Sequence, residues 1–193
     1  MLIGLLGLAA CSAPVANRDS MGTNVICFGD SVTQGVGVSP AETYPAILGQ
    51  MLNRSVINAG VSRNTTRDAV GRLKTDVLDR NPLLVIVEFG ANDFLQEISE
   101  AETLRNIDQI VEEIEESGAM VVLTEIQVGI IRDRYYKGFK EIAERRKAVF
   151  MPDLMSDIMF EPEMKTDSVH PNAKGNRLIA GRIYKVIAPL LNH

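Results

Sequence analysis

Histidine is scarce in this chain of 193 residues, which contains only His170 and His193. Any chemistry that needs an imidazole has two candidates, and nothing in the sequence would orient His193, the last residue. Cysteine is as rare: only Cys11 and Cys27 occur, and without a CxxC motif or a Cys/His cluster the sequence indicates no zinc site. The net charge of -5 and the lack of a Lys/Arg-rich run give a nucleic-acid partner no electrostatic support.

A membrane-spanning run is also missing at the start, where the apolar stretch over residues 1–11 is too short to cross a bilayer as a helix. Its end, Leu8-Ala9-Ala10-Cys11, resembles the bacterial lipobox, in which the cysteine is lipidated and becomes the mature N-terminus. No Lys or Arg precedes the apolar part, which departs from the usual signal pattern, and a buried first strand or helix is the alternative.

We therefore predict a signal segment over residues 1–11, lipidation at Cys11 and a small, polar tether over residues 12–22. These features would place the protein in the bacterial cell envelope as a periplasmic lipoprotein whose only membrane contact is the anchor at Cys11. Acylation of Cys11 would leave Cys27 without a disulfide partner.

The remaining residues, 23–193, are predicted to form one domain in which short apolar runs alternate with amphipathic stretches. The apolar runs are rich in β-branched residues, as is typical of strands buried on both faces of a parallel sheet: 25–28, 55–58, 83–87, 120–123 and the shorter 148–151. Helical spacing of apolar residues occurs over 44–52, 69–78, 104–114, 136–143 and 178–190. This order predicts an α/β fold, a three-layer α/β/α sandwich with a flavodoxin-like parallel sheet of about five strands.

Polar residues of chemical interest fall where the predicted strands end. Ser31 follows the first strand, Gly60 the second and Asn92 the third, while His170 lies in the loop before the last helix. Right-handed crossovers bring the carboxyl ends of parallel strands to one edge of the sheet. Residues remote in sequence are therefore expected to converge there.

Four short motifs at these positions carry a family resemblance: Gly29-Asp30-Ser31 with Thr33 and Gly35, Asn58-Ala59-Gly60, Gly90-Ala91-Asn92-Asp93, and Asp167-Ser168-Val169-His170-Pro171. With them the chain resembles the SGNH or GDSL family of serine esterases and lipases, from about Val25 to the last helix. It is most similar to the small arylesterases, lysophospholipases and acyl-CoA thioesterases. The resemblance implies hydrolysis of an ester or thioester by acyl transfer, with no metal and no organic cofactor.

The residue types support this chemistry independently. A serine hydroxyl is a poor nucleophile at neutral pH and needs a base, so we predict Ser31 as nucleophile and His170 as its base. Asp167, three residues before His170, can hold the imidazole in the required tautomer. The N–H of Ser31 and the amide of Asn92 are predicted as oxyanion donors, and the resemblance adds the N–H of Gly60.

Each of these residues also has an ordinary interpretation on its own. Ser31 and Gly60 fit a turn, Asn92 a helix cap and His170 a loop. Asp30 and Asp93 are predicted to be structural, and a nucleotide loop is excluded because no Lys-Ser or Lys-Thr follows Gly35 and Pro40 replaces the third glycine of a dinucleotide motif.

The expected partner is a small ester or lysophospholipid, and the predicted envelope location favours a lipid or acylated envelope substrate over acyl-CoA. Pocket loops such as residues 126–135 would decide the choice. A carbohydrate O-deacetylase of the same fold and a non-catalytic envelope-binding lipoprotein are the alternatives.

Overall fold

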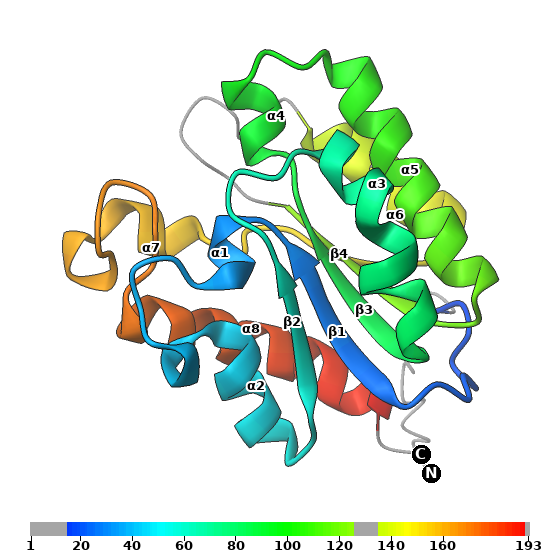
Figure 1. Cartoon of the computed structure of the whole chain (residues 1–193), viewed down its shortest axis with the longest axis horizontal. Coiled ribbons are helices and arrows are strands. Elements are labelled where there is room, and N and C mark those ends of the chain that lie inside the picture. Colours follow the sequence, from blue (N-terminus) through cyan, green and yellow to red (C-terminus); the bar gives the residue numbers. More distant parts are fainter. Residues whose placement is uncertain (1–14, 126–134, 192–193) are drawn as a thin grey trace, which may run out of the picture.

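A computed structural model of the chain describes residues 15–125 and 135–191 (Figure 1). The predictions for the signal segment, for lipidation of Cys11, for most of the pocket loop over 126–135 and for His193 fall outside these ranges.

The described residues form a parallel sheet of five strands, which confirms the predicted fold class. The strands are β1 (Asn24–Gly29), β2 (Val56–Gly60), β3 (Pro82–Glu88), β4 (Met120–Thr124) and β5 (Val149–Met151). Their order across the sheet is β2-β1-β3-β4-β5, the flavodoxin-like order. In this order the chain reverses direction across the sheet beside β1, so a crevice is expected at the carboxyl end of β1.

Helices cover both faces of the sheet and complete the three layers (Figure 1). One face is covered by α3 (Thr66–Asp76), α5 (Glu100–Glu116) and α6 (Tyr136–Arg146), and the other by α2 (Tyr44–Leu52) and α8 (Ala173–Leu191). Shorter helices lie in the loops: α1 (Ser31–Gln34), α4 (Ala91–Leu95), α7 (Ser156–Phe160) and the 3-10 turns Pro40–Glu42, Leu78–Arg80 and Pro162–Met164.

Alternate residues of each strand enter different cores, as a sheet buried on both faces requires. In β1, Ile26 and Phe28 pack under α3 and α5, whereas Val25 and Cys27 pack under α2 and α8. Burial also raises the pKa of the Cys27 thiol. Cys27 is therefore a small core residue, as the apolar strand around it indicated.

The segment predicted as a tether is described from residue 15 onward, and this part lies against the domain. Asn17 Nδ2 donates to the main-chain oxygens of Glu115 and Ala119 at 2.7 and 3.0 Å, just where α5 ends. Ala16 N donates to the main-chain oxygen of Lys147 at 3.0 Å. Ala16 and Asn17 thus contact the domain, and the tether over residues 12–22 stays a prediction. Within the described ranges, no helix has the length and apolar character needed to cross a membrane.

Candidate active site

The turn after β1 presents Ser31 at the edge of the sheet. Asp30 caps α1 by accepting a hydrogen bond from Val32 N at 3.0 Å, and Ser31 is the first residue of that helix. Gly29 is required at this turn because a Cβ there would lie 2.1 Å from Thr33 Oγ1. The close packing of β1 against α1 therefore fixes where the serine emerges.

The loop before α8 brings His170 to the same edge. Asp167 Oδ1 accepts hydrogen bonds from the backbone N–H groups of Val169 and His170 at 2.9 and 2.8 Å, and its Oδ2 lies 2.7 Å from His170 Nδ1. On the other side of the ring, His170 Nε2 lies 3.0 Å from Ser31 Oγ, across a sequence separation of 139 residues. Ser31, His170 and Asp167 thus form one hydrogen-bonded series, in the order the sequence predicted.

Charge at the site is set by burial and hydrogen bonding. Hydrogen bonds from the His170 side chain and from the backbone N–H groups of His170 and Val169 lower the pKa of Asp167, so this carboxylate stays ionised. Burial raises the pKa of Asp30 to about 6, against the hydrogen bond from Val32. Asp167 is therefore the carboxylate suited to stabilise a protonated His170.

A second buried carboxyl group lies behind the turn. Glu88, the last residue of β3, is fully buried and accepts a hydrogen bond from Thr33 Oγ1 at 2.7 Å. Thr33 Oγ1 also lies 2.8 Å from the hydroxyl of Tyr44. Burial and the neighbouring charge of Asp30 raise the pKa of Glu88 well above its usual value. Glu88 thus supports α1 from inside the protein and does not line the pocket.

Ser31 and His170 open onto a pocket of about 270 Å³ with largely apolar walls. Its lining residues are Asp30, Ser31, Val32, Ser62, Arg63, Ala91, Asn92, Leu95, Met155, Val169 and His170. Leu95 is 70% exposed although it is a large apolar side chain. An exposed apolar wall beside Ser31 is suited to contact the apolar part of a ligand.

Asn92 lies in this pocket, as predicted, at the start of α4. Its Nδ2 donates to Asp30 Oδ2 at 2.9 Å and to the main-chain oxygen of Asn64 at 3.0 Å. The amide is therefore held in a fixed orientation. The next residue, Asp93, is buried and accepts hydrogen bonds from the backbone N–H and hydroxyl of Thr66, in keeping with the structural role expected for it.

The structure places Gly60 differently from the prediction. Its N–H donates to Asn58 Oδ1 at 2.9 Å, and Gly60 is absent from the pocket lining. A Cβ at this position would lie 2.1 Å from Gln34 N, so the glycine serves the close packing of β2 against α1. In this structure the N–H of Gly60 is thus bonded to Asn58 and does not face the pocket, where the predicted oxyanion would form.

Arg63, which the sequence reasoning missed, lies on the pocket wall instead. Its φ of 68° is in the left-handed region, where residues other than glycine are uncommon. Together with Ser62, Arg63 is the part of the loop after β2 that lines the pocket. An arginine gives no sequence signal for this backbone conformation, because turn patterns point to Gly, Asn or Asp.

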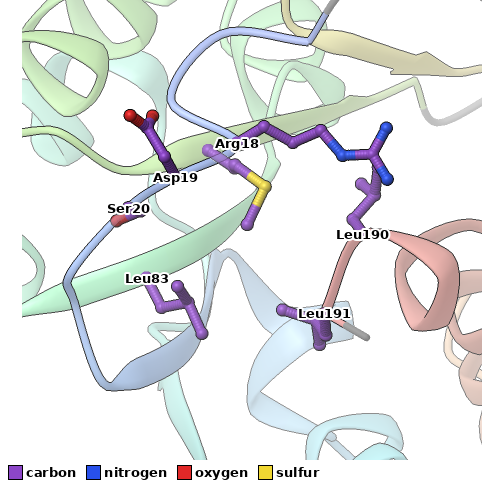
Figure 2. Close-up of a pocket in the computed structure, with 7 residues that line it drawn as sticks. Arg18, Asp19, Ser20, Leu83, Leu190 and Leu191 are labelled. Atoms are coloured by element: carbon purple, nitrogen blue, oxygen red, sulfur yellow. The ribbon is translucent and has the colours of Figure 1, made fainter. Parts of the chain in front are cut away.

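A larger cavity of about 550 Å³ lies at the opposite ends of the strands, where β3 and β4 begin (Figure 2). It is lined by Arg18, Asp19, Ser20, Leu83, Met120, Leu190 and Leu191. These residues include no histidine or cysteine, so no imidazole lies beside Ser20 there. Elsewhere in the described chain, no three His, Cys, Asp or Glu side chains are grouped as metal ligands.

The chain is similar to known proteins in sequence and in fold. A model of the GDSL-like Lipase/Acylhydrolase family matches residues 27–178. Thioesterase 1/protease 1/lysophospholipase L1 of Escherichia coli K12 is 27% identical over 184 residues, which are 91% of this chain and 88% of that protein.

The chain is also similar to a solved esterase structure and, over part of its length, to a lipoprotein. The psychrotrophic esterase EstA from Pseudoalteromonas sp., inhibited by monoethylphosphonate, has a TM-score of 0.79 at 28% identity, covering 89% of this chain and all of its own. The uncharacterized lipoprotein YqeF of Bacillus subtilis is 38% identical over 77 residues, which are 36% of this chain and 32% of that protein. With most of its length matched by the family model, the chain belongs to the GDSL-like lipase/acylhydrolase family and is an ester hydrolase of the esterase or lipase type.

Proposed function

We propose that the protein is a serine esterase that cleaves carboxylic esters or thioesters by acyl transfer through Ser31, His170 and Asp167. The observation that carries the proposal is the 3.0 Å approach of Ser31 Oγ to His170 Nε2, with Nδ1 of the same ring 2.7 Å from Asp167. A nucleophile within hydrogen-bond reach of a base, which a third group orients, is the arrangement that nucleophilic catalysis requires.

The reaction then proceeds in two steps. Ser31 Oγ attacks the substrate carbonyl carbon while its proton passes to His170 Nε2, and Asp167 stabilises the imidazolium. The tetrahedral intermediate collapses when His170 returns the proton to the leaving alkoxide or thiolate, which leaves an acyl group on Ser31. Water, deprotonated by His170, attacks the acyl-enzyme and releases the carboxylic acid and the serine hydroxyl.

For the oxyanion we propose the backbone N–H groups of Ser31 and Arg63 together with the Asn92 amide. Arg63 replaces Gly60 in this role because Arg63 lines the pocket, whereas the N–H of Gly60 is bonded to Asn58. The Asn92 amide already has two acceptors, Asp30 and the main-chain oxygen of Asn64, so an oxyanion would share one of its N–H groups. A donor of this kind contributes about 2.7–4 kcal/mol in the transition state.

The substrate we propose is a small ester or lysophospholipid with an apolar acyl group. Leu95, Met155 and Val169 supply apolar walls beside Ser31, and the volume of about 270 Å³ favours a chain of limited length. The Escherichia coli relative bears the names thioesterase and lysophospholipase, which supports thioesters and lysophospholipids as substrates to test.

A panel of p-nitrophenyl esters from acetate to decanoate tests the function, with lysophosphatidylcholine, acyl-CoA and acetylated xylan as further substrates. We expect hydrolysis of the p-nitrophenyl esters, with kcat/KM rising beyond acetate because longer chains bury more apolar surface. Activity confined to acetylated xylan would indicate a carbohydrate O-deacetylase. A folded protein without activity on any of these substrates would support the non-catalytic alternative.

For location, we propose a periplasmic lipoprotein anchored in the bacterial envelope through Cys11. The lipobox-like end of residues 1–11 and the partial similarity to the Bacillus subtilis lipoprotein support this proposal. Mass spectrometry of the protein purified from bacterial membranes should show a mature N-terminus at Cys11 with added acyl mass. An N-terminus at Met1, or a Cys11 without acyl groups, would contradict the proposal.

A further inference from the structure

Arg72, on α3, connects the two strand ends that support the site. Among the described residues, its guanidinium donates to four acceptors: Gly29 O at 2.9 Å, Ala59 O at 2.8 Å, Asn64 Oδ1 at 2.6 Å and Asp76 Oδ2 at 2.8 Å. The side chain is only 15% exposed. An arginine that binds the backbone of two strands and the side chain of a loop residue does more than form a surface ion pair.

The same guanidinium also packs against two aromatic rings. Its central carbon lies 4.4 Å from the ring centroid of Phe28 and 5.7 Å from that of Phe89. The two rings contact each other edge to face at 5.0 Å. Stacking on Phe28 restricts the plane of the guanidinium, and its N–H groups are then directed along fixed lines toward their acceptors.

Two of these hydrogen bonds go to residues that directly support Ser31 and Asn92. Gly29, whose main-chain oxygen accepts one of them, is the last residue of β1 and lies two residues before Ser31. Asn64, whose side chain binds Arg72, accepts a hydrogen bond from Asn92 Nδ2 through its main-chain oxygen. One side chain therefore fixes both the turn that carries Ser31 and the partner that orients the Asn92 amide.

We propose that Arg72 is a positioning residue for the acyl-transfer reaction, which holds the ends of β1 and β2 and, through Asn64, sets the Asn92 amide relative to Ser31. Arg72 does not line the pocket, so it acts only through these neighbours. The inference rests on the proposed function. A residue with a purely structural role would change stability when replaced and leave the catalytic rate of the folded protein unaltered.

The test compares Arg72→Met and Arg72→Lys with Arg146→Met. Arg146 is a matched control because its side chain is similarly buried, 22% exposed, and its hydrogen bonds go to Asp108 and Glu112 of α5, neither of which lines the pocket. Each variant is assayed for Tm, kcat and KM with a p-nitrophenyl ester, well below its Tm. We expect Arg72→Met to lower kcat by about 10²-fold, the cost of a displacement of about 1 Å at a reacting group, with KM within a few-fold of the parent.

Arg72→Lys should recover part of the rate, because it keeps the charge and loses the planar fork of donors. Asn64→Ala provides a second route if Arg72→Met does not fold. It removes the acceptor of one bond from Arg72 and keeps the main-chain oxygen that binds Asn92. We expect a smaller loss of kcat in Asn64→Ala. In the double variant with Arg72→Lys the losses should be less than multiplicative, since both changes weaken the same connection.

The inference is overturned if folded Arg72→Met keeps the parent kcat, or if Arg146→Met loses as much kcat for an equal loss of Tm. Failure of the proposed function gives a different result: the parent lacks esterase activity, or Ser31→Ala retains it, and the inference about Arg72 then falls too. Activity that depends on Ser31 but not on Arg72 or Asn64 contradicts only the inference about Arg72.

Discussion

Replacing either Ser31 or His170 with alanine is expected to lower kcat for p-nitrophenyl ester hydrolysis by about 10⁴- to 10⁶-fold. Ser31→Ala removes the attacking oxygen, and His170→Ala removes the base 3.0 Å from it. Neither side chain belongs to the hydrophobic clusters of the domain, so both variants should fold with Tm near that of the parent. Steady-state kinetics with a purified, folded variant measures the loss.

The double variant should lose little more than either single variant, because a nucleophile without its base and a base without its nucleophile are equally ineffective. Ser168→Ala is the matched control, since Ser168 is an exposed serine two residues before His170 and does not line the pocket. It should keep the parent kcat. A folded Ser31→Ala that retains more than about a tenth of the parent kcat, far above the loss expected for a triad member, would contradict the proposed nucleophile.

The elements that place these residues could be predicted from sequence for a simple reason. Strands buried on both faces need continuous apolar runs, and such runs are visible without any structure. Right-handed crossovers then bring the strand ends to one edge, so Ser31, Asn92 and His170 were expected to meet, and the structure brings all three into one pocket. The amphipathic pattern also predicted the buried face of α5 correctly, because Ile107, Ile110, Val111 and Ile114 are all fully buried.

Boundaries were less accurate because side-chain caps and burial override periodicity. The helix expected over 69–78 begins instead at Thr66, where Thr65 and Asp68 form a capping box. The strand expected over 83–87 continues to Glu88, a charged type that periodicity assigns to solvent and that the structure buries against Thr33. The short helix α7 has too few residues to show a helical period.

Details of the site that depend on backbone angles or on distant contacts were beyond sequence reasoning. Gly60 was chosen because glycine fits a close approach, and it does make one, toward the backbone of Gln34 and not toward the pocket. Arg63 lines the pocket and has a left-handed φ, which its residue type disfavours. Arg72 resembles any arginine on an exposed helix until its acceptors from β1, β2 and the following loop are known.

Asp167→Asn is expected to lower kcat by about 10⁴-fold while the loop keeps its shape. In the parent, Asp167 Oδ1 accepts the backbone N–H groups of Val169 and His170, and an asparagine oxygen can do the same. The asparagine Nδ2 would then face His170 Nδ1 and donate to it, which forces the ring proton onto Nε2. Because Nε2 carries a proton in that tautomer, it cannot accept one from Ser31.

The pH dependence of stability separates this electrostatic role from a steric one. Hydrogen bonds with His170 lower the folded-state pKa of Asp167 below the ordinary value of 3.8, so its contribution to stability is present above that value and is lost as the pH falls through the folded pKa. The difference in unfolding free energy between parent and Asp167→Asn should therefore be constant at neutral pH and shrink in acid below about pH 4. Urea unfolding at several pH values, with kcat measured on the same samples, checks both effects. An Asp167→Asn variant with the parent kcat, or a stability difference that does not diminish in acid, would show that the carboxylate does not hold His170 for proton transfer.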